Sequence, residues 1–270
     1  MWHRLKEAGL NAAILKGQGV ATEYGELASL RQSGDIDVWV LGGYDKVCEY
    51  VQSVAPTKDV AYHRFHFEVF KDTEVELHHR PTLMRNLFDD RKLTRWYNSF
   101  HVDSFRFLED KGFAVPSYDF NRIFILTHIY RHFLFEGIGL RQVMDFYFVL
   151  LNSTGNKDEL KLLKDFRLTR FAQAIMWILY SQFGLEREKL MACGMNEKEG
   201  RFVLNEIMTT GNFGQADQRY RYVHLRKVRQ KLAHGAHLIS HYPLEVVWTP
   251  IWLLYHRYWK KQTKRNQKKI

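Results

Sequence analysis

The sequence has little cysteine and no long apolar run, and both shortages limit what kind of protein it is. Only two of its 270 residues are cysteines. Cys48 and Cys193 match no ligand or redox spacing, so we interpret them as reduced packing residues of a cytoplasmic protein. No stretch approaches the roughly 18 apolar residues that a membrane-spanning helix needs. Residues 1–15 carry charges and no apolar core of signal-peptide length, which argues against secretion.

Acidic residues are almost absent from the end of the chain. From Arg219 to Ile270 there are 13 Lys or Arg and one acid, Glu245, whereas the first 218 residues hold 27 basic and 29 acidic side chains. A protein that grips a long nucleic acid needs a basic track beside its site. The first 218 residues show no such track. A site in that part of the chain is therefore better suited to a small-molecule or protein acceptor than to nucleic acid.

What the sequence does contain is a short acidic pattern inside Gly34-Asp-Ile-Asp-Val-Trp-Val40. Ile36, Val38 and Val40 alternate with the residues between them, which predicts a strand with Asp35 and Asp37 on one face. Two neighbouring carboxylates repel each other and call for a cation or for basic side chains. Oxygen ligands at this spacing suit Mg²⁺. The alternative is that both aspartates end a strand in solvent, although aspartate is depleted in strands.

A glycine turn precedes this strand. Residues 12–15 read as a short buried strand, and Lys16, Gly17 and Gly19 fall in a turn before a helical stretch. A strand, a glycine turn and a helix N-terminus form a common anion site, because free backbone N–H groups face the ligand. Lys16 and Arg31 could add positive charge against phosphate. A plain surface role for both side chains is the alternative.

A third acidic position lies downstream. We predict a helix over Tyr44–Val54, a strand over Val60–Phe70, a hairpin connection at 71–73 and a return strand over Glu74–His79. Glu74, Glu76 and His78 then share one face of the return strand. Either Glu76 or Glu74 is the candidate third catalytic acid. His78 either orients a carboxylate or touches phosphate, or it is a solvated edge-strand histidine.

These motifs, in this order, resemble the polymerase-beta-like nucleotidyltransferase superfamily. More narrowly, ILKG (14–17), GDIDVWV (34–40), VELH (75–78) and LRQVMDF (140–146) resemble an uncharacterised nucleotidyltransferase family of bacterial proteins, often from polysaccharide loci. The resemblance implies a two-metal transfer of a nucleoside monophosphate from an NTP to an unknown hydroxyl acceptor, with Mg²⁺ or Mn²⁺ as the cofactor. It implies that Asp35, Asp37 and Glu76 are the catalytic residues and metal ligands. It also implies that the phosphates are bound by Lys16, Gly17, Gly19 and Arg31.

Beyond Pro116-Ser117 the pattern becomes helical. The spacing predicts helices over Asp119–Phe135, Leu140–Leu151, Leu160–Phe166, Thr169–Phe183 and Glu197–Met208. The fold class is thus α+β: a nucleotidyltransferase-type mixed sheet with flanking helices in domain 1–115, a helical domain 116–240, and an aromatic, basic end 241–270.

The first two predicted helices carry a polar set. His128 and His132 share a helix face, as do Arg141 and Asp145. The segment HIYRH lacks the glutamate of HExxH, which argues against a zinc protease. The family resemblance implies that this stretch completes the active-site cleft, with His132 and Arg141 on the nucleotide. A buried polar network that fixes the hairpin is the alternative, favoured for Asp145.

The end of the chain is aromatic and basic. We predict a basic helix over Arg219–His237 and a second helix whose Trp248, Trp252, Tyr255 and Trp259 share one face. Such a helix suits peripheral binding to an anionic membrane surface; alternatively, its tryptophan face packs on the protein's own helical domain, and nucleic-acid binding is a weaker third option. This end motivates a second functional hypothesis, a non-catalytic nucleotide-binding or scaffold protein of a polysaccharide-assembly locus.

Overall fold

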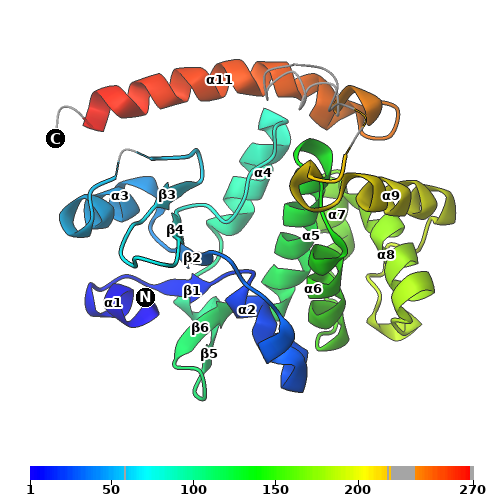
Figure 1. Cartoon of the computed structure of the whole chain (residues 1–270), viewed down its shortest axis with the longest axis horizontal. Helices are drawn as coiled ribbons and strands as arrows, with labels where there is room; N and C mark the ends of the chain where they lie inside the picture. The colour runs from blue at the N-terminus through cyan, green and yellow to red at the C-terminus, as the bar shows by residue number, and fades with distance from the viewer. Residues whose placement is uncertain (58, 218, 220–234, 268–270) are drawn as a thin grey trace. The chain divides into compact units, whose positions relative to one another are not determined.

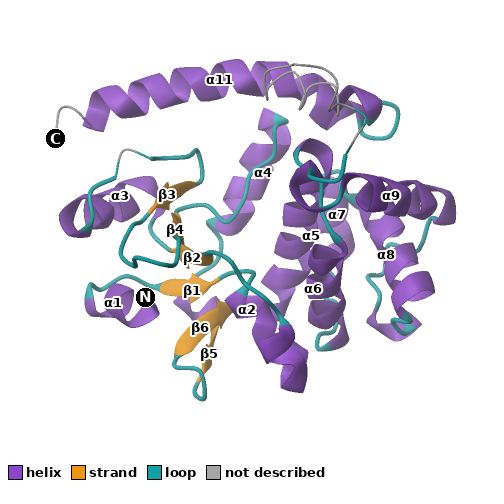
Figure 2. Ribbon diagram, in the orientation of Figure 1, coloured by secondary structure: helices purple, strands orange, loops and turns teal. Residues whose placement is uncertain are grey.

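The chain forms two compact units. Figures 1 and 2 show its helices and strands. The computed structural model describes residues 1–57, 59–217, 219 and 235–267. The first unit comprises residues 1–83, 93–117 and 251–270, and the second comprises residues 84–92 and 118–250. The predicted domains 1–115, 116–240 and 241–270 stay predictions, because a domain is defined by independent folding.

A four-stranded mixed sheet organises the first unit, as the sequence predicted. Its strands follow the order β1-β2-β4-β3. The pairs β1–β2 and β3–β4 are antiparallel, whereas β2 and β4 are parallel. A parallel pair needs a crossover connection, and helix α3 lies in the segment between β2 and β4. The bounds are α1 Trp2–Glu7, β1 Ala12–Ile14, β2 Ile36–Val40, α3 Gly43–Val54, β3 Arg64–His66 and β4 Val75–His78.

The two faces of this sheet have different chemistry. Val38 and Val40 of β2 and Leu77 of β4 join one buried cluster with Leu5 of α1 and Val47 of α3. Helices α1 and α3 therefore contribute to the apolar core on this face. The alternation of the strands sends the intervening side chains of β2 and β4 to the other face. That second face carries the polar residues of the candidate site.

An aromatic group shares the second face with those polar residues. Trp39 of β2 lies 5.4 Å from Phe105, 6.1 Å from Phe100 and 6.2 Å from Tyr97, measured between ring centroids. Trp39 is buried. Edge-to-face contacts of this kind favour a dry packing layer. The aromatic rings cover the second face of the sheet beyond the strand ends that carry the acidic side chains.

Three local predictions for the first unit need correction. The strand predicted over Val60–Phe70 is reduced to β3, because its partner β4 has only four residues and pairing ends with it. The helix predicted after the glycine turn is the four-residue α2 (Gln18–Ala21), followed by a 3₁₀ segment η1 (Thr22–Leu30) with a non-helical glycine inside. Residues 100–107 alternate in the sequence, which predicts a strand there. The strand starts later, as β5 Phe105–Leu108 after η2 Val102–Ser104, and it pairs with β6 Phe113–Pro116, which we did not predict.

The second unit is helical, as predicted. The bounds of α6 and α8 match the predicted ranges, and the other helices agree to within two residues. Helix α4 (Leu87–Tyr97) begins in the second unit and ends in the first. The remaining elements are α5 Tyr118–Phe135, α6 Leu140–Leu151, α7 Glu159–Asp165, α8 Thr169–Phe183, η3 Arg187–Lys189, α9 Glu197–Thr210 and η4 Asn212–Gly214.

A buried ion pair lies inside this helical unit. Arg122 of α5 is 1 % exposed and Glu159 of α7 is 4 % exposed. Their side chains meet through two hydrogen bonds, Nε–Oε2 at 2.5 Å and Nη2–Oε1 at 3.3 Å, and Arg122 also donates to Ser153 Oγ at 3.1 Å. Burying two charges is expensive unless each satisfies the other. The pair therefore fixes how α7 meets α5.

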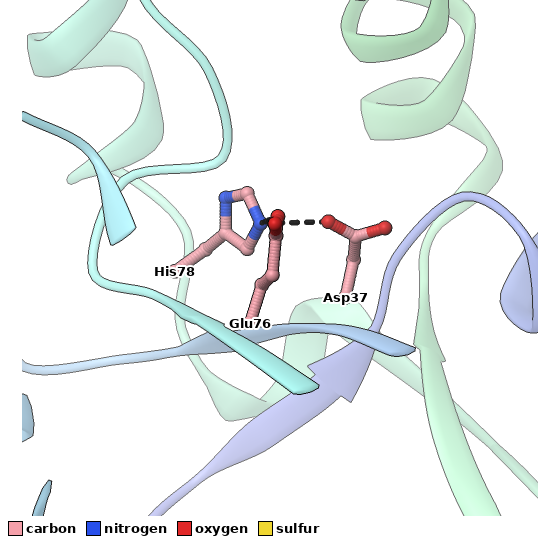
Figure 3. Close-up of side chains that lie close together, drawn as sticks. All are labelled: Asp37, Glu76 and His78. Carbon is pink, nitrogen blue, oxygen red and sulfur yellow. Dashed lines mark hydrogen bonds and ion pairs between the residues drawn. The ribbon is translucent and has the colours of Figure 1, made fainter. Parts of the chain in front are cut away.

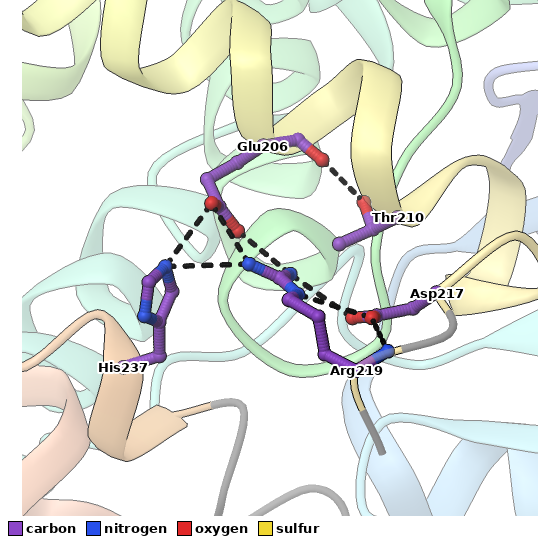
Figure 4. A network of polar contacts seen from close by, with 5 residues as sticks. All are labelled: Glu206, Thr210, Asp217, Arg219 and His237. Carbon is purple, nitrogen blue, oxygen red and sulfur yellow. Dashed lines mark hydrogen bonds and ion pairs between the residues drawn. The ribbon is translucent and has the colours of Figure 1, made fainter. Parts of the chain in front are cut away.

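A second buried carboxylate, Glu206 of α9, gathers polar groups from two parts of the chain (Figure 4). Arg219 donates to both of its oxygens at 3.0 Å, and His237 lies 3.1 Å from one of them. Arg219 also donates to Asp217 at 3.0 Å. The basic helix predicted over Arg219–His237 lies mostly outside the described residues, of which Arg219 and residues 235–237 are the described part.

The last helix, α11 (Pro243–Gln267), has its aromatic face partly covered. Within the first unit, the ring of Tyr62 lies 5.3 Å from Trp259 and 6.4 Å from Trp252, and Tyr44 lies 6.4 Å from Trp259. The tryptophan face thus packs on the protein, in accordance with the alternative to membrane binding. Its partners come from the sheet-containing unit, whereas that alternative named the helical domain. None of the helices in the described part of the chain is long and apolar enough to cross a membrane.

Glu245, near the start of α11, gives a pH-dependent prediction for the second unit. It is 5 % exposed and accepts hydrogen bonds from the backbone N–H of Arg85 at 2.9 Å and of Asn86 at 3.3 Å. Burial raises the pKa of this carboxyl to about 7. The folded state then keeps a proton that the unfolded state has released, so this contribution to stability is lost as pH rises towards and through 7.

We therefore expect the stability of wild type relative to Glu245→Gln to fall by about 2–3 kcal/mol between pH 5 and pH 8. Urea unfolding of both proteins across this range measures the difference. Titrating groups that the two proteins share cancel in the comparison. A pH-independent difference would contradict the buried, raised-pKa state of Glu245.

Candidate functional site

Two carboxylates and an imidazole converge on the second face of the sheet. The parallel pairing of β2 and β4 sets Asp37 directly opposite Glu76 and Trp39 opposite His78. Asp37 is 1 % exposed, Glu76 5 % and His78 3 %. Each offers one ligand atom, and the three atoms lie within 4.8 Å of one another. Figure 3 shows the three side chains rising from neighbouring strands towards a common point.

Asp37 is held ionised by two neighbours. Its Oδ2 lies 2.5 Å from Lys16 Nζ, and its Oδ1 lies 2.8 Å from His78 Nε2. Burial alone would raise the pKa of Asp37, but the Lys16 ammonium and the hydrogen bond with His78 hold that pKa well below its usual range. An ionised buried carboxylate is ready to bind a cation without first losing a proton.

Burial lowers the pKa of His78, which favours the neutral imidazole. Its Nε2 lies 3.4 Å from Glu76 Oε2 as well as beside Asp37. Its Nδ1 is buried and has no hydrogen-bond partner among the described residues. The neutral form is the one that ligates metal ions. The solvated edge-strand histidine considered as an alternative does not describe this side chain.

Glu76 is the buried acid of β4, whereas Glu74 is exposed. Glu76 forms an ion pair with Arg64 of the adjacent strand β3. We did not single out Arg64 from the sequence. The alternation of the predicted strand put Arg64 on one face with His66, but a single charge on an edge strand carries no signal of its own. It reaches Glu76 because of the antiparallel register of β3 and β4.

Asp35 lies at the rim of this group. Its side chain is 39 % exposed, and its Oδ2 lies 3.8 Å from Lys16 Nζ. It is not part of the three-residue ligand set. Lys16 therefore lies close to both aspartates. Its ammonium occupies the space between Asp35 and Asp37 in which the sequence predicted metal ions.

The glycine turn brings Lys16 to this position. Leu15 N–H donates to the carbonyl of Asp37 at 2.8 Å, and Gly19 N–H donates to the carbonyl of Leu15 at 3.1 Å. Gly17 has φ +55°, and a Cβ on Gly19 would lie 2.3 Å from the carbonyl oxygen of Ile14. Both positions therefore require glycine. The four-residue α2 is too short to supply a strong helix dipole, so the predicted phosphate contact depends mainly on Lys16.

Arg31 turns towards its own segment of chain. Its guanidinium contacts the carbonyl of Gln32 and lies 3.4 Å from Ser33 Oγ. The side chain is half-buried. Its predicted role on phosphate, like those of Lys16, Gly17 and Gly19, stays a prediction.

The polar residues predicted on the helical hairpin belong to the second unit. The rings of His128 and His132 lie 4.4 Å apart between centroids. His132 Nδ1 lies 2.6 Å from Glu136 Oε2. Asp145 is buried, whereas Arg141 is exposed on the first turn of α6. The predicted roles of His132 and Arg141 on the nucleotide, and of His128 and Asp145 as secondary residues, stay predictions.

The donor set fits a divalent cation. Two carboxylates supply hard oxygen ligands, which suit Mg²⁺ and Mn²⁺, and the imidazole is a ligand that transition metals accept more readily than Mg²⁺ does. Asp37, Glu76 and His78 would hold the ion. Binding through Nε2 would place the imidazole proton on Nδ1, which has no hydrogen-bond partner among the described residues.

The comparisons with known proteins place the chain in a family. No curated protein and no solved structure matches it. The family described as "Uncharacterised nucleotidyltransferase" matches residues 2–184, which include the whole Asp37, Glu76 and His78 set and the Lys16 turn. The chain therefore belongs to this uncharacterised family of nucleotidyltransferases.

Proposed function

We propose that this protein is a metal-dependent enzyme that transfers a nucleoside monophosphate from an NTP to the hydroxyl group of a protein, a sugar or a small molecule. The single observation that carries the proposal is the convergence of Asp37, Glu76 and His78 from two strands whose register is fixed by the backbone. Family membership supports nucleotidyl transfer as the reaction class.

Residues of the candidate site have separate roles in this reaction. Asp37 and Glu76 would hold the cation, and His78 would be the third ligand. Lys16, which lies 2.5 Å from Asp37, moves its ammonium onto a phosphate oxygen when the substrate enters. Asp35, at the exposed rim, accepts the proton of the acceptor hydroxyl or adds a ligand oxygen. When bound, the metal neutralises the charge that develops on the transferred phosphoryl group.

The charge balance of the free site favours Lys16 as a mobile group. Lys16 and Arg64 together neutralise Asp37 and Glu76 before any metal binds. A divalent cation brings two more positive charges, and the triphosphate of an NTP brings negative charge that offsets them. We therefore expect metal and nucleotide to bind cooperatively, each more tightly in the presence of the other.

Calorimetry tests this proposal directly. Wild-type protein is titrated with each NTP in the presence of Mg²⁺, of Mn²⁺ or of EDTA, and pyrophosphate release is then measured with candidate acceptors. Metal-dependent NTP binding is the expected result. Its absence for every NTP and both metals would overturn the enzyme proposal.

The same charge balance motivates the second candidate, a non-catalytic nucleotide-binding or scaffold protein. A carboxylate pair already neutralised by Lys16 and Arg64 is stable without an ion. NTP binding that is unaffected by EDTA, with no pyrophosphate released, would favour this candidate over the enzyme.

Glu76 in β4 and Glu74 just before it provide a matched test of the ligand set. We expect Glu76→Gln to weaken Mn²⁺ binding more than about 100-fold, beyond the 10–100-fold loss typical of residues that surround metal ligands. Glu74→Gln, two residues away and exposed, is expected to leave it unchanged. Calorimetric titration with Mn²⁺ and an NTP measures both variants. Equal losses in the two would mean that Glu76 is not a ligand.

A further inference from the structure

Helix α11 exposes a row of apolar side chains that is distinct from its tryptophan face. Ile251, Leu254 and Tyr258 are 46 %, 65 % and 62 % exposed. Their spacing of three and four residues places them on one side of the helix. We call these three residues the apolar stripe.

The apolar stripe has no cover from the aromatic residues of the first unit. Those aromatics meet Trp252, His256 and Trp259, which lie on the neighbouring face of α11. Single exposed apolar residues are ordinary on protein surfaces, whereas a contiguous exposed row marks an interaction site. The helix therefore uses one face for the protein's own packing and keeps a second apolar face for something else.

The charges beside the apolar stripe indicate what that partner is. No acidic residue follows Glu245, and seven basic residues do. Arg257, Lys260 and Lys261 are exposed in the structure. The other four lie further along the sequence: Lys264, Arg265, Lys268 and Lys269. An apolar row beside a cluster of cations complements a partner that has a negatively charged outer layer and an apolar interior.

A second copy of this chain is a poor fit for the same face. Two helices paired side by side in parallel would bring two sets of seven cations together, and like charges at an interface oppose pairing. An antiparallel pair would need acids at the start of α11 to meet those cations. The acid available in this helix is Glu245, which is buried and accepts hydrogen bonds from the backbone of Arg85 and Asn86.

We propose that the apolar stripe binds the surface of an anionic lipid bilayer. Helix α11 lies in the plane of the interface, the apolar stripe enters the boundary between headgroups and acyl chains, and the Lys and Arg side chains meet the anionic headgroups. This inference does not depend on the proposed enzymatic function.

Co-sedimentation with vesicles tests the proposal on the full chain. The vesicles are phosphatidylcholine alone, or phosphatidylcholine with about a third phosphatidylserine, which supplies the negative surface potential. Wild type is expected to bind the anionic vesicles and to be released by high salt, since the attraction is screened. Leu254→Glu is expected to weaken binding at least about tenfold, because it removes an apolar side chain that would enter the bilayer and adds a charge that the anionic headgroups repel.

A matched control and the oligomeric state complete the design. Met208→Glu makes the same kind of change at a side chain that is 62 % exposed on α9, and it is expected to bind like wild type. Failure of wild type to bind anionic vesicles would overturn the proposal. So would equal binding by Leu254→Glu. A wild-type dimer that Leu254→Glu converts to monomer, without vesicle binding by either, would assign the apolar stripe to self-association instead.

Discussion

Replacing Asp37 by asparagine is expected to abolish metal-dependent NTP binding and to lower any nucleotidyl transfer by about 10³-fold. Asp37 is the residue at which the candidate site converges: it faces Glu76 across the strand pair and contacts both Lys16 and His78. A metal ion contributes several kcal/mol of stabilisation to developing charge, and each 1.4 kcal/mol corresponds to a factor of ten in rate. Asparagine keeps the shape of the side chain but removes the charge that attracts the cation.

The measurement is calorimetric titration with NTP and Mn²⁺, followed by pyrophosphate release. Asp110→Asn is the matched control, because its side chain is 73 % exposed and its ion pair is with the neighbouring Lys111. Circular dichroism shows whether both variants fold. Retained metal-dependent binding in a folded Asp37→Asn protein would remove the proposed site, whatever the family of the chain.

Replacing Glu159 by leucine is expected to cost about 3–5 kcal/mol of unfolding free energy in the helical unit. The change strands the Arg122 guanidinium, which is 1 % exposed and loses both of its charged hydrogen bonds. The desolvated guanidinium then keeps its hydrogen bond to Ser153 Oγ. Urea unfolding followed by helix content measures the loss.

Two further variants separate this explanation from a general defect. The double variant Arg122→Met/Glu159→Leu removes both charges and is expected to recover most of the lost stability, since a buried pair is often replaceable by apolar side chains. Glu197→Leu breaks the exposed pair with Arg201 and is expected to change stability by less than about 0.5 kcal/mol. A double variant no more stable than Glu159→Leu would show that side-chain shape, not an unpaired charge, causes the loss.

The acidic strand was predictable because one short segment carries its whole signal. Alternation over residues 36–40 identified β2 and put Asp37 on the face opposite the core, and both features are confirmed. Alternation also put Asp35 on that face. The strand begins at Ile36, so backbone pairing with β4 starts after Asp35 and leaves its side chain 39 % exposed. A period-two pattern predicts the strand face on which a residue lies, but it does not predict where the strand begins and ends.

The choice between Glu74 and Glu76 depended on information that alternation does not contain. Alternation puts both on the same face of the predicted strand. The pairing of β2 with β4 sets Glu76 opposite Asp37 and begins at Val75, which leaves Glu74 outside the strand. The same is true of Arg64, whose contact with Glu76 follows from the register of β3. Long-range register is decided by the packing of the whole sheet, which short sequence motifs do not report.

The aromatic helix at the end of the chain shows a different limit. The sequence identified one apolar face, formed by the tryptophans, and offered membrane or protein as its partner. The structure gives α11 two apolar faces, and the tryptophan face is the one that packs on Tyr62 and Tyr44. Helical spacing locates both faces, but the covered face is known only once the surfaces that meet it are placed.

The parallel pairing of β2 with β4 has a consequence for how this protein tolerates change. The alignment of its acidic side chains is held in part by main-chain hydrogen bonds, such as Ile36 N–H to the carbonyl of Glu74 at 2.8 Å. Insertions in the long connection between the strands leave that alignment intact. Deleting one residue of β4 before Leu77 would instead turn Leu77 towards Asp37 and turn Glu76 into the apolar core.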